Sequence, residues 1–282
     1  MVGATLLWGG TFVAIREIVR VMPPQALVCG RFLAAALLFA LLGLIRRRAP
    51  GRNDLEVGIG NGVLMVGSYY LQALGLKYTS AGSSAFLTCA GTLATAIYAW
   101  VLLRERPRAS LFVGIALALA GSALMSLDRT LHLGRGEILS LLGSTLYALQ
   151  IVWIARHGSE LDPISVVTVQ AATVALLAAP FAGALPHVLR TLSFAGWERF
   201  LYLAVAGSAI APLLQVLAQQ RLSAGRVGLL FALEPVFALL FALTMGGERF
   251  ALRWWAGAAL ILSAVVLVEW RAASTTRPAA SC

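Results

Sequence analysis

The chain has 282 residues, of which 60% are hydrophobic and 12% charged, with a mean hydropathy of +0.85. Soluble domains carry about 25% charged residues and about 45–50% apolar ones, so this composition excludes a water-exposed globule. The net charge is +10, from 22 Lys and Arg against 12 Asp and Glu. Short loops of membrane proteins are rich in basic residues, so we expect this excess to fix topology and not to bind nucleic acid.

Apolar windows long enough to cross a bilayer, about 20 residues each, recur along the whole chain. We predict an all-α integral membrane protein with ten transmembrane helices, at residues 2–15, 25–45, 57–76, 81–103, 109–127, 138–155, 164–186, 200–220, 227–247 and 254–270. The connections are too short for a soluble domain. The cluster Arg46-Arg47-Arg48 with Arg52 lies between the second and third windows, and it predicts that both termini are cytoplasmic.

Catalytic and metal-binding signatures are missing from the sequence. Cys29, Cys89 and Cys282 form no CxxC pair and have no metal-ligand spacing. There is no GxSxG, HExxH or P-loop motif. We therefore expect a protein that is not an enzyme and needs neither a metal nor a cofactor.

The two halves of the chain match each other at a constant offset of 143 residues. Leu-Gln-Ala-Leu at 71–74 falls on Leu-Gln-Val-Leu at 214–217, while Ser-Ala-Gly at 80–82 recurs at 223–225 and Glu-Arg at 105–106 recurs at 248–249. Five helices are an odd number, so the second half must enter the membrane from the opposite side. We predict inverted repeats at 1–127 and 128–271 around a central cavity, followed by a cytoplasmic tail at 272–282. This architecture is typical of alternating-access carriers, and a gene duplication without a transport role is the alternative.

Several motifs resemble those of a known family. The segment 6–14, with Pro23-Pro24 and Gly30-Arg31-Phe32, resembles the start of the drug/metabolite transporter superfamily, in particular its ten-helix EamA-type members. Leu233-Glu234-Pro235-Val236 is similar to a later motif of that family, as are 78–81 and 247–248. The resemblance covers nearly the whole chain and is nearest to YddG-like exporters of amino acids and related metabolites. It implies a 5+5 inverted repeat and export across a bacterial inner membrane.

Polar and aromatic side chains at depth are the candidates for a solute site, because facing lipid would be costly for them. We expect four amide side chains to line a cavity: Gln72, Gln150, Gln215 and Gln219. Rings at depth can hold an apolar solute and hydrogen-bond its polar end. These are Trp8, Tyr69, Tyr70, Tyr98 and Tyr147, to which we add Thr11 of the first motif. Each ring also fits a packed core, and we favour helix packing for the stripe Ser84, Thr88, Thr92 and Thr95.

Glu234 is the sharpest single candidate. An ionised carboxylate is costly at mid-span, so this side chain must be protonated, paired or in contact with water. Proton coupling, capture of a substrate amine, and a structural hydrogen bond at the backbone break near Pro235 all fit the sequence.

Arg31 is the basic residue predicted inside a helix. It fits a receptor for a substrate carboxylate, a side chain that snorkels outward, or a partner of Glu17. Glu105 and Glu248 close the fourth and ninth helices, and we expect them to cap the helices that follow.

Together these features predict an exporter of small metabolites that works by alternating access. Amino acids, including aromatic or apolar ones, are the first hypothesis for the solute. A proton-coupled exporter of lipophilic cations that bind at Glu234 is the second, and a non-transporting membrane scaffold is the third. We expect a bacterial inner-membrane protein that functions as a monomer.

Overall fold

A computed structural model gives the fold and describes residues 1–126, 134–157, 160–245 and 252–275. All regular structure in these ranges is helical, which confirms the predicted fold class at that level. The helices are α1 (Val2–Gly9), α2 (Thr11–Ile18), α3 (Pro24–Arg46), α4 (Arg52–Gly75), α5 (Ala81–Leu93), α6 (Thr95–Leu103), α7 (Ala109–Ser126), α8 (Arg135–Arg156), α9 (Pro163–Ala178), α10 (Leu185–Thr191), α11 (Phe194–Tyr202), α12 (Ala211–Gln219), α13 (Ala224–Leu230), α14 (Glu234–Met245) and α15 (Leu252–Thr275).

Seven helical stretches in the described ranges are long and apolar enough to cross a bilayer. They are Pro24–Arg46, Ser83–Leu103, Arg135–Arg156, Pro163–Phe181, Phe194–Gln219, Ala224–Phe241 and Leu252–Ala272. The other three predicted windows correspond to the interrupted pair α1–α2, to α4 with its charged first turns, and to the shorter apolar helix α7. A multi-pass membrane protein fits this set of helices.

Local sequence explains where the helices begin. Proline occupies the first position of α3 and α9, where its missing N–H costs no hydrogen bond. Asp162 caps α9 by accepting the backbone N–H of Ser165 at 3.1 Å, and Arg46 donates to both carboxylate oxygens at 3.2 and 3.3 Å. Burial raises the pKa of Asp162, but the hydrogen bonds from Ser165 and Arg46 outweigh burial and bring it below its ordinary value.

Four predicted windows are not single continuous helices. The window 2–15 is divided at Gly10, 81–103 is divided at Ala94, and 227–247 contains the 3-10 turn Phe231–Leu233. The prediction of one helix over 164–186 is wrong: α9 ends at Ala178, and Pro186 lies in the first turn of α10. Pro180 follows in the 3-10 turn Ala179–Phe181, and because a proline has no N–H to donate, the helical ladder of α9 stops ahead of it.

A π-helical segment, Leu203–Ile210, connects α11 to α12. Its wider turn is visible in the side-chain bonding, because the Ser208 hydroxyl donates to the carbonyl oxygen of Leu203, five residues earlier, at 2.9 Å. Such segments are rare and often occur at functional sites.

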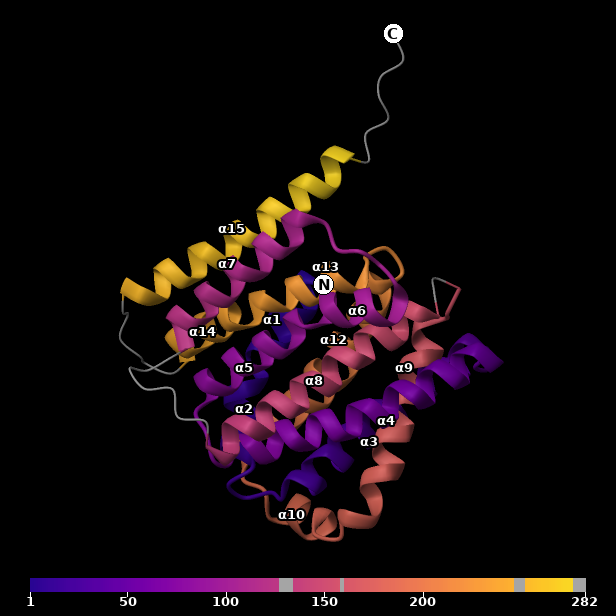
Figure 1. The fold of residues 1–282 in the computed structure, drawn as a ribbon. Coiled ribbons are helices and arrows are strands. Elements are labelled where there is room, and N and C mark those ends of the chain that lie inside the picture. Colours follow the sequence, from indigo (N-terminus) through magenta and orange to yellow (C-terminus); the bar gives the residue numbers. More distant parts are fainter. Residues whose placement is uncertain (127–133, 158–159, 246–251, 276–282) are drawn as a thin grey trace.

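Small residues let the helices approach closely. Gly58 and Gly62 of α4 face α9, where a Cβ on Gly58 would lie 3.0 Å from the carbonyl oxygen of Val166. A Cβ on Gly62 would lie 2.9 Å from that of Gln170. Lipid gives helices no hydrophobic reason to associate, so close packing of this kind stabilises their contact. Figure 1 shows a second close pair, α7 and α15, side by side at one edge of the bundle.

Candidate functional site

A small cavity lies where the interrupted helices meet. It is lined by Trp8, Thr11, Phe12, Tyr69, Gln72, Thr88, Tyr147, Phe231 and Glu234. Its volume is about 20 Å³, which is room for roughly one water molecule. Six of these nine residues were predicted as site residues from the sequence: Trp8, Thr11, Tyr69, Gln72, Tyr147 and Glu234.

Four rings form what we call the aromatic cage: Trp8, Tyr69, Tyr147 and Phe231. The rings of Trp8 and Phe231 are stacked, with centroids 5.1 Å apart and 21° between their planes. Tyr147 meets Trp8, Phe231 and Tyr69 edge to face, at 5.8, 5.2 and 6.1 Å. Offset and edge-to-face pairs are the favoured geometries of aromatic side chains. The cage therefore presents apolar faces to the cavity while the rings stabilise each other.

Hydrogen bonds at the back of the cage hold two of its rings. The indole N–H of Trp8 donates to the carbonyl oxygen of Gly207 in the π-helical segment at 3.0 Å. The Tyr147 hydroxyl donates to Gln215 Oε1 at 2.8 Å. Gln215 in turn donates to Gln219 Oε1 at 2.8 Å, and Gln219 donates to the carbonyl oxygen of Ile151 at 2.8 Å. Gln215 and Gln219 thus lie behind Tyr147, outside the residues that line the cavity.

Glu234 is a buried carboxylate on the cavity wall. Its residue is 3% exposed and begins α14, directly after the 3-10 turn Phe231–Leu233. The N-terminus of a helix favours negative charge, so this position reduces the cost of an ionised side chain. Glu234 Oε2 has no hydrogen-bond partner among the described residues. A buried polar atom without a partner costs free energy, and a bound solute or water would remove that cost.

Arg31 is buried beside the same cavity and is 1% exposed. Its Nε donates to Ser208 Oγ at 2.5 Å, and its Cζ lies 4.9 Å from the ring centroid of Tyr69. Arg31 Nη2 has no hydrogen-bond partner within the described ranges. The structure contradicts two of the three readings of this residue: it does not snorkel outward, and Glu17 pairs with Arg20 at 3.1 Å.

Close packing against the π-helical segment fixes the place of the guanidinium. A Cβ on Gly207 would lie 2.8 Å from Arg31 Nη2 and 3.0 Å from Thr11 Cγ2. Thr11 lines the cavity, so the unpartnered end of Arg31 lies next to the cavity wall. Glycine at position 207 is what leaves room for the guanidinium there.

The remaining predicted site residues lie elsewhere. Gln150 is buried in α8, and both polar atoms of its amide lack a partner among the described residues. Tyr98 is half-buried in α6 against the hydrophobic core, and Tyr70 lines a separate apolar pocket of about 460 Å³ beside α3 and α9. Glu105 is exposed two residues beyond the end of α6, and Glu248 lies outside the described residues.

Three lining residues were not predicted as site residues: Phe12, Thr88 and Phe231. Phe231 precedes Glu234 by three positions, so helical spacing could have placed both on one face. Thr88 was assigned to helix packing; it lines the cavity, and its buried Oγ1 has no hydrogen-bond partner among the described residues. No sequence signal distinguishes Phe12 from an ordinary core ring.

Comparison with known proteins identifies the family. The model of the EamA-like transporter family matches residues 1–127 and 134–270. The chain belongs to this family. It is therefore a membrane-spanning transporter of small molecules, as the sequence predicted at that level.

Other proteins align with the chain over most of their length. An uncharacterized transporter of Archaeoglobus fulgidus is 27% identical over 270 residues, 94% of this chain and 83% of that protein. The uncharacterized inner membrane transporter YedA of Escherichia coli is 29% identical over 269 residues, 93% of this chain and 87% of its own. A crystal structure with a TM-score of 0.77 covers 98% of this chain and 96% of that chain at 19% identity, which shows a shared fold.

Proposed function

We propose that this EamA-family transporter exports amino acids, including aromatic or apolar ones. The observation that carries the proposal is a buried arginine and a buried glutamate at the aromatic cage, each with a polar atom that has no partner among the described residues. Arg31 lies over the ring of Tyr69, and Glu234 lines the cavity with the four rings, so both side chains adjoin the cage.

The chemistry of this arrangement matches a zwitterion. A guanidinium binds a carboxylate with paired, charge-assisted hydrogen bonds, and a carboxylate accepts from an ammonium group. Buried charges are costly unless they are paired. In this arrangement the solute carboxylate would pair with the guanidinium, and the solute ammonium group would pair with the carboxylate of the protein. The rings of the cage offer apolar and edge-to-face contacts to the solute side chain.

The cavity has to widen before it can take such a solute. Small-molecule sites usually enclose about 300–1,000 Å³, far more than the present cavity. The helix interruptions at Gly10, at Ala94 and at Phe231–Leu233, with the π-helical segment, all lie in helices that form or flank the cavity. Interrupted helices supply the hinge positions that alternating access requires.

Contacts between the halves support ten spans in two inverted repeats. Each span of the first half has an equivalent five spans later, and the two halves show equivalent contacts. The equivalent spans α3 and α9 contact each other, as do α7 and α15. The contact of α4 with α8 corresponds to that of α12 with α1, and the contact of α4 with α9 corresponds to that of the π-helical segment with α3. The two ranges matched by the family model, 1–127 and 134–270, support a division into halves at 1–127 and 128–271. We place the site on the pseudo-two-fold axis between them.

The proposal includes the membrane topology and the cellular membrane of the protein. The arginine cluster between α3 and α4 supports cytoplasmic termini and a cytoplasmic tail at 272–282. The name of the relative YedA supports an inner membrane. Two halves can enclose a pathway between them, so a monomer suffices.

Counterflow in liposomes tests the solute class. Purified protein is loaded with unlabelled amino acid, and uptake of labelled phenylalanine and of a labelled lipophilic cation is measured with and without a pH gradient. We expect phenylalanine exchange in the wild type and its loss in Glu234→Gln, because the amide cannot accept the ammonium group as a carboxylate does. Glu105→Gln is the matched control, since it removes an exposed carboxylate outside the cage. Phenylalanine exchange that survives Glu234→Gln would show that this carboxylate neither binds the amine nor couples protons.

A second candidate is a proton-coupled exporter of lipophilic cations. The specific observation that favours it is the position of the Glu234 carboxylate beside four rings, a combination that binds organic cations through cation–π contacts. Cation uptake driven by a pH gradient, without phenylalanine exchange, would replace the first proposal with this one. Absence of flux for every solute would favour the scaffold hypothesis.

A further inference from the structure

Thr88 of α5 lines the cavity at the aromatic cage, is 7% exposed, and has a hydroxyl without a partner among the described residues. Threonine hydroxyls in helices commonly donate to a backbone carbonyl three or four residues earlier. Thr92, one turn later in the same helix, does so to the carbonyl oxygens of Thr88 and Cys89, both at 3.0 Å. The Thr88 hydroxyl makes no such bond. A buried hydroxyl of this kind costs free energy unless a ligand or a water molecule binds it.

Two other hydroxyls on the cavity wall already have acceptors within the protein. Thr11 donates to the carbonyl oxygen of Trp8 at 2.7 Å. Tyr147 donates to Gln215 Oε1 at 2.8 Å. The hydrogens of both hydroxyls therefore stabilise the wall itself and are not available to a solute.

The charged ends of a solute have partners other than Thr88. This step rests on the proposed function, in which an amino acid binds with its carboxylate at Arg31 and its ammonium group at Glu234. The Tyr69 hydroxyl also has no partner among the described residues, but its ring centroid lies 4.9 Å from Arg31 Cζ, which places Tyr69 at the carboxylate end. The part of an amino acid that remains for Thr88 is its side chain.

Gln72 of α4 lines the same cavity and adds a second polar group. In the internal repeat it occupies the position of Gln215, because residues 71–74 fall on 214–217. Gln215 Oε1 accepts from the phenol hydroxyl of Tyr147, so this position of the repeat already binds a phenol in the second half. In the first half the equivalent glutamine faces the cavity, where a phenol supplied by a solute fits the equivalent place.

We infer that Gln72 and Thr88 form a polar wall that binds a hydroxyl on the side chain of the solute, and that the transporter prefers hydroxylated aromatic amino acids. The phenol hydroxyl of tyrosine donates to Gln72 Oε1 and accepts from the Thr88 hydroxyl, while the cage rings pack against its ring. A site built to bind a hydroxyl discriminates against the analogue that lacks it, because the polar groups of the site then stay unpaired. Phenylalanine is that analogue.

Competition for counterflow in liposomes measures this preference. Exchange of labelled phenylalanine by the wild type is inhibited with unlabelled tyrosine, phenylalanine or 4-fluorophenylalanine. We expect tyrosine to inhibit by half at about one-tenth of the concentration that phenylalanine requires, since two hydrogen bonds of ordinary net strength correspond to roughly tenfold. 4-Fluorophenylalanine carries a substituent at the same place but donates no hydrogen bond, so it should match phenylalanine. If it inhibited as well as tyrosine, hydrogen bonding would not explain the preference and the inference would be overturned.

Thr88→Val removes the hydroxyl and keeps a side chain of similar shape. We expect the tyrosine preference to fall from about tenfold to about threefold, because one of the two hydrogen bonds is lost. Thr95→Val is the matched control: Thr95 is fully buried and its Oγ1 also lacks a partner among the described residues, but it does not line the cavity. An unchanged preference in Thr88→Val, or an equal loss in Thr95→Val, would contradict the inference. If Thr88→Val fails to fold, the wild-type comparison of tyrosine with 4-fluorophenylalanine still decides.

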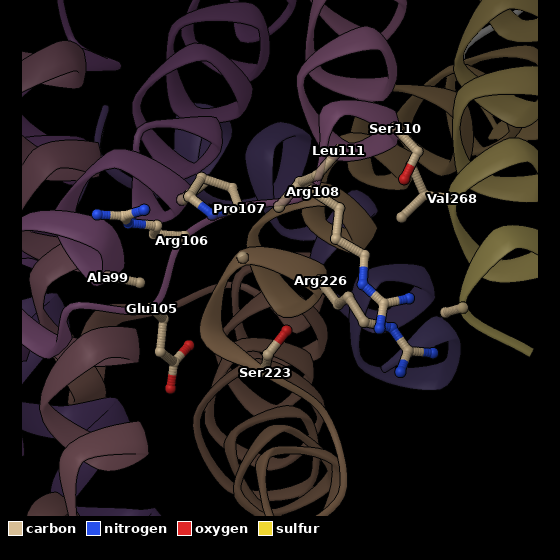
Figure 2. A pocket seen from close by; sticks show the side chains of 13 residues that line it. Ala99, Glu105, Arg106, Pro107, Arg108, Ser110, Leu111, Ser223, Arg226 and Val268 are labelled. Carbon is tan, nitrogen blue, oxygen red and sulfur yellow. The ribbon is translucent and has the colours of Figure 1, made fainter. Parts of the chain in front are cut away.

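A separate pocket of about 320 Å³, where α6, α7, α13 and α15 meet, is the competing location for the solute (Figure 2). It shares no lining residue with the cavity at the cage. Ser110 lines this pocket, so Ser110→Ala should leave the tyrosine preference unchanged, and its loss in that variant would place the tyrosine hydroxyl there instead. Equal inhibition by tyrosine and phenylalanine would overturn this inference alone, whereas exchange of neither amino acid would overturn the proposed function with it.

Discussion

Replacing Arg31 with methionine should make the protein more stable and the transporter less active. Arg31 is 1% exposed, and the described residues around it offer a serine hydroxyl and two ring faces but no carboxylate within 4.0 Å. Keeping a buried charge in such surroundings is costly. Methionine keeps most of the length and the apolar packing of the side chain without the charge.

The magnitude follows from the contacts that change. The substitution loses the bond to Ser208 Oγ, about 1.5–3 kcal/mol, and cation–π contacts with Tyr69 and Phe32 of about 1 kcal/mol each. Ser208 keeps its own donor bond to Leu203, so its hydroxyl hydrogen remains satisfied. Apolar replacement of buried charged groups often gives a net gain of about 1–4 kcal/mol, a figure that already includes the loss of such contacts. For transport, loss of charge-assisted bonds of about 1.5–3 kcal/mol predicts roughly a 10- to 150-fold weaker interaction with a solute carboxylate.

Two assays on the same variant separate these effects. Thermal unfolding in detergent should give a Tm equal to or above that of the wild type. Liposome counterflow should lose phenylalanine exchange but keep any exchange of phenethylamine, which lacks the carboxylate. A Tm well below the wild type with phenylalanine and phenethylamine equally affected would refute the reasoning, because it would make Arg31 a structural residue.

Three further predictions concern packing, pH and the hydrogen bonds behind the cage. Gly62→Ala places a Cβ 2.9 Å from a backbone carbonyl oxygen of α9, so the free energy of unfolding should fall by about 1–3 kcal/mol, whereas Gly183→Ala, with nothing within 4 Å, should leave Tm unchanged. The pKa of Asp162 is lower in the folded state than its ordinary value of 3.8, so the ionised carboxylate stabilises the fold above pH 3.8 and this stabilisation is lost as the pH falls through the folded pKa. The Tm of the wild type should therefore exceed that of Asp162→Asn by less as the pH falls below about 4. Tyr147→Phe keeps the ring but leaves Gln215 Oε1 without its donor, which should cost about 1–3 kcal/mol, and adding Gln215→Leu should recover part of it in a double-mutant cycle unless the two side chains act independently.

The membrane class and most cavity residues could be predicted from the sequence because both depend on local composition. Apolar windows locate the spans, and polar or aromatic side chains at mid-window must avoid lipid, which selects Trp8, Tyr69, Tyr147 and Glu234. Burial at depth does not say which neighbour a side chain meets. Gln215 satisfies every criterion for a lining residue, yet its amide oxygen accepts from Tyr147, 68 residues earlier in the chain.

Apolar windows in the sequence could not predict the helix interruptions. Hydropathy averages over about 20 residues and is the same for a straight helix and for one broken at Gly10 or Ala94. Position 10 also shows a tertiary requirement for glycine: a Cβ there would collide with the Tyr202 hydroxyl, which donates to the carbonyl oxygen of Leu7 at 2.5 Å. Two interruptions do have a local signal: Pro180 directly follows the end of α9, and Pro235 lies in the first turn of α14 after the 3-10 turn.

The π-helical segment contacts two parts of the proposed solute site. The Trp8 indole donates to the carbonyl oxygen of Gly207, and the Arg31 guanidinium donates to the side chain of the next residue, Ser208. One contact positions a ring of the cage, and the other positions the charge expected to meet the solute carboxylate. A π-helical turn that tightened to an α-helical one would rotate consecutive residues against both partners at once. Because Trp8 belongs to α1 and Arg31 to α3, a change of register within this one segment would alter the cage and the charge site in a single step.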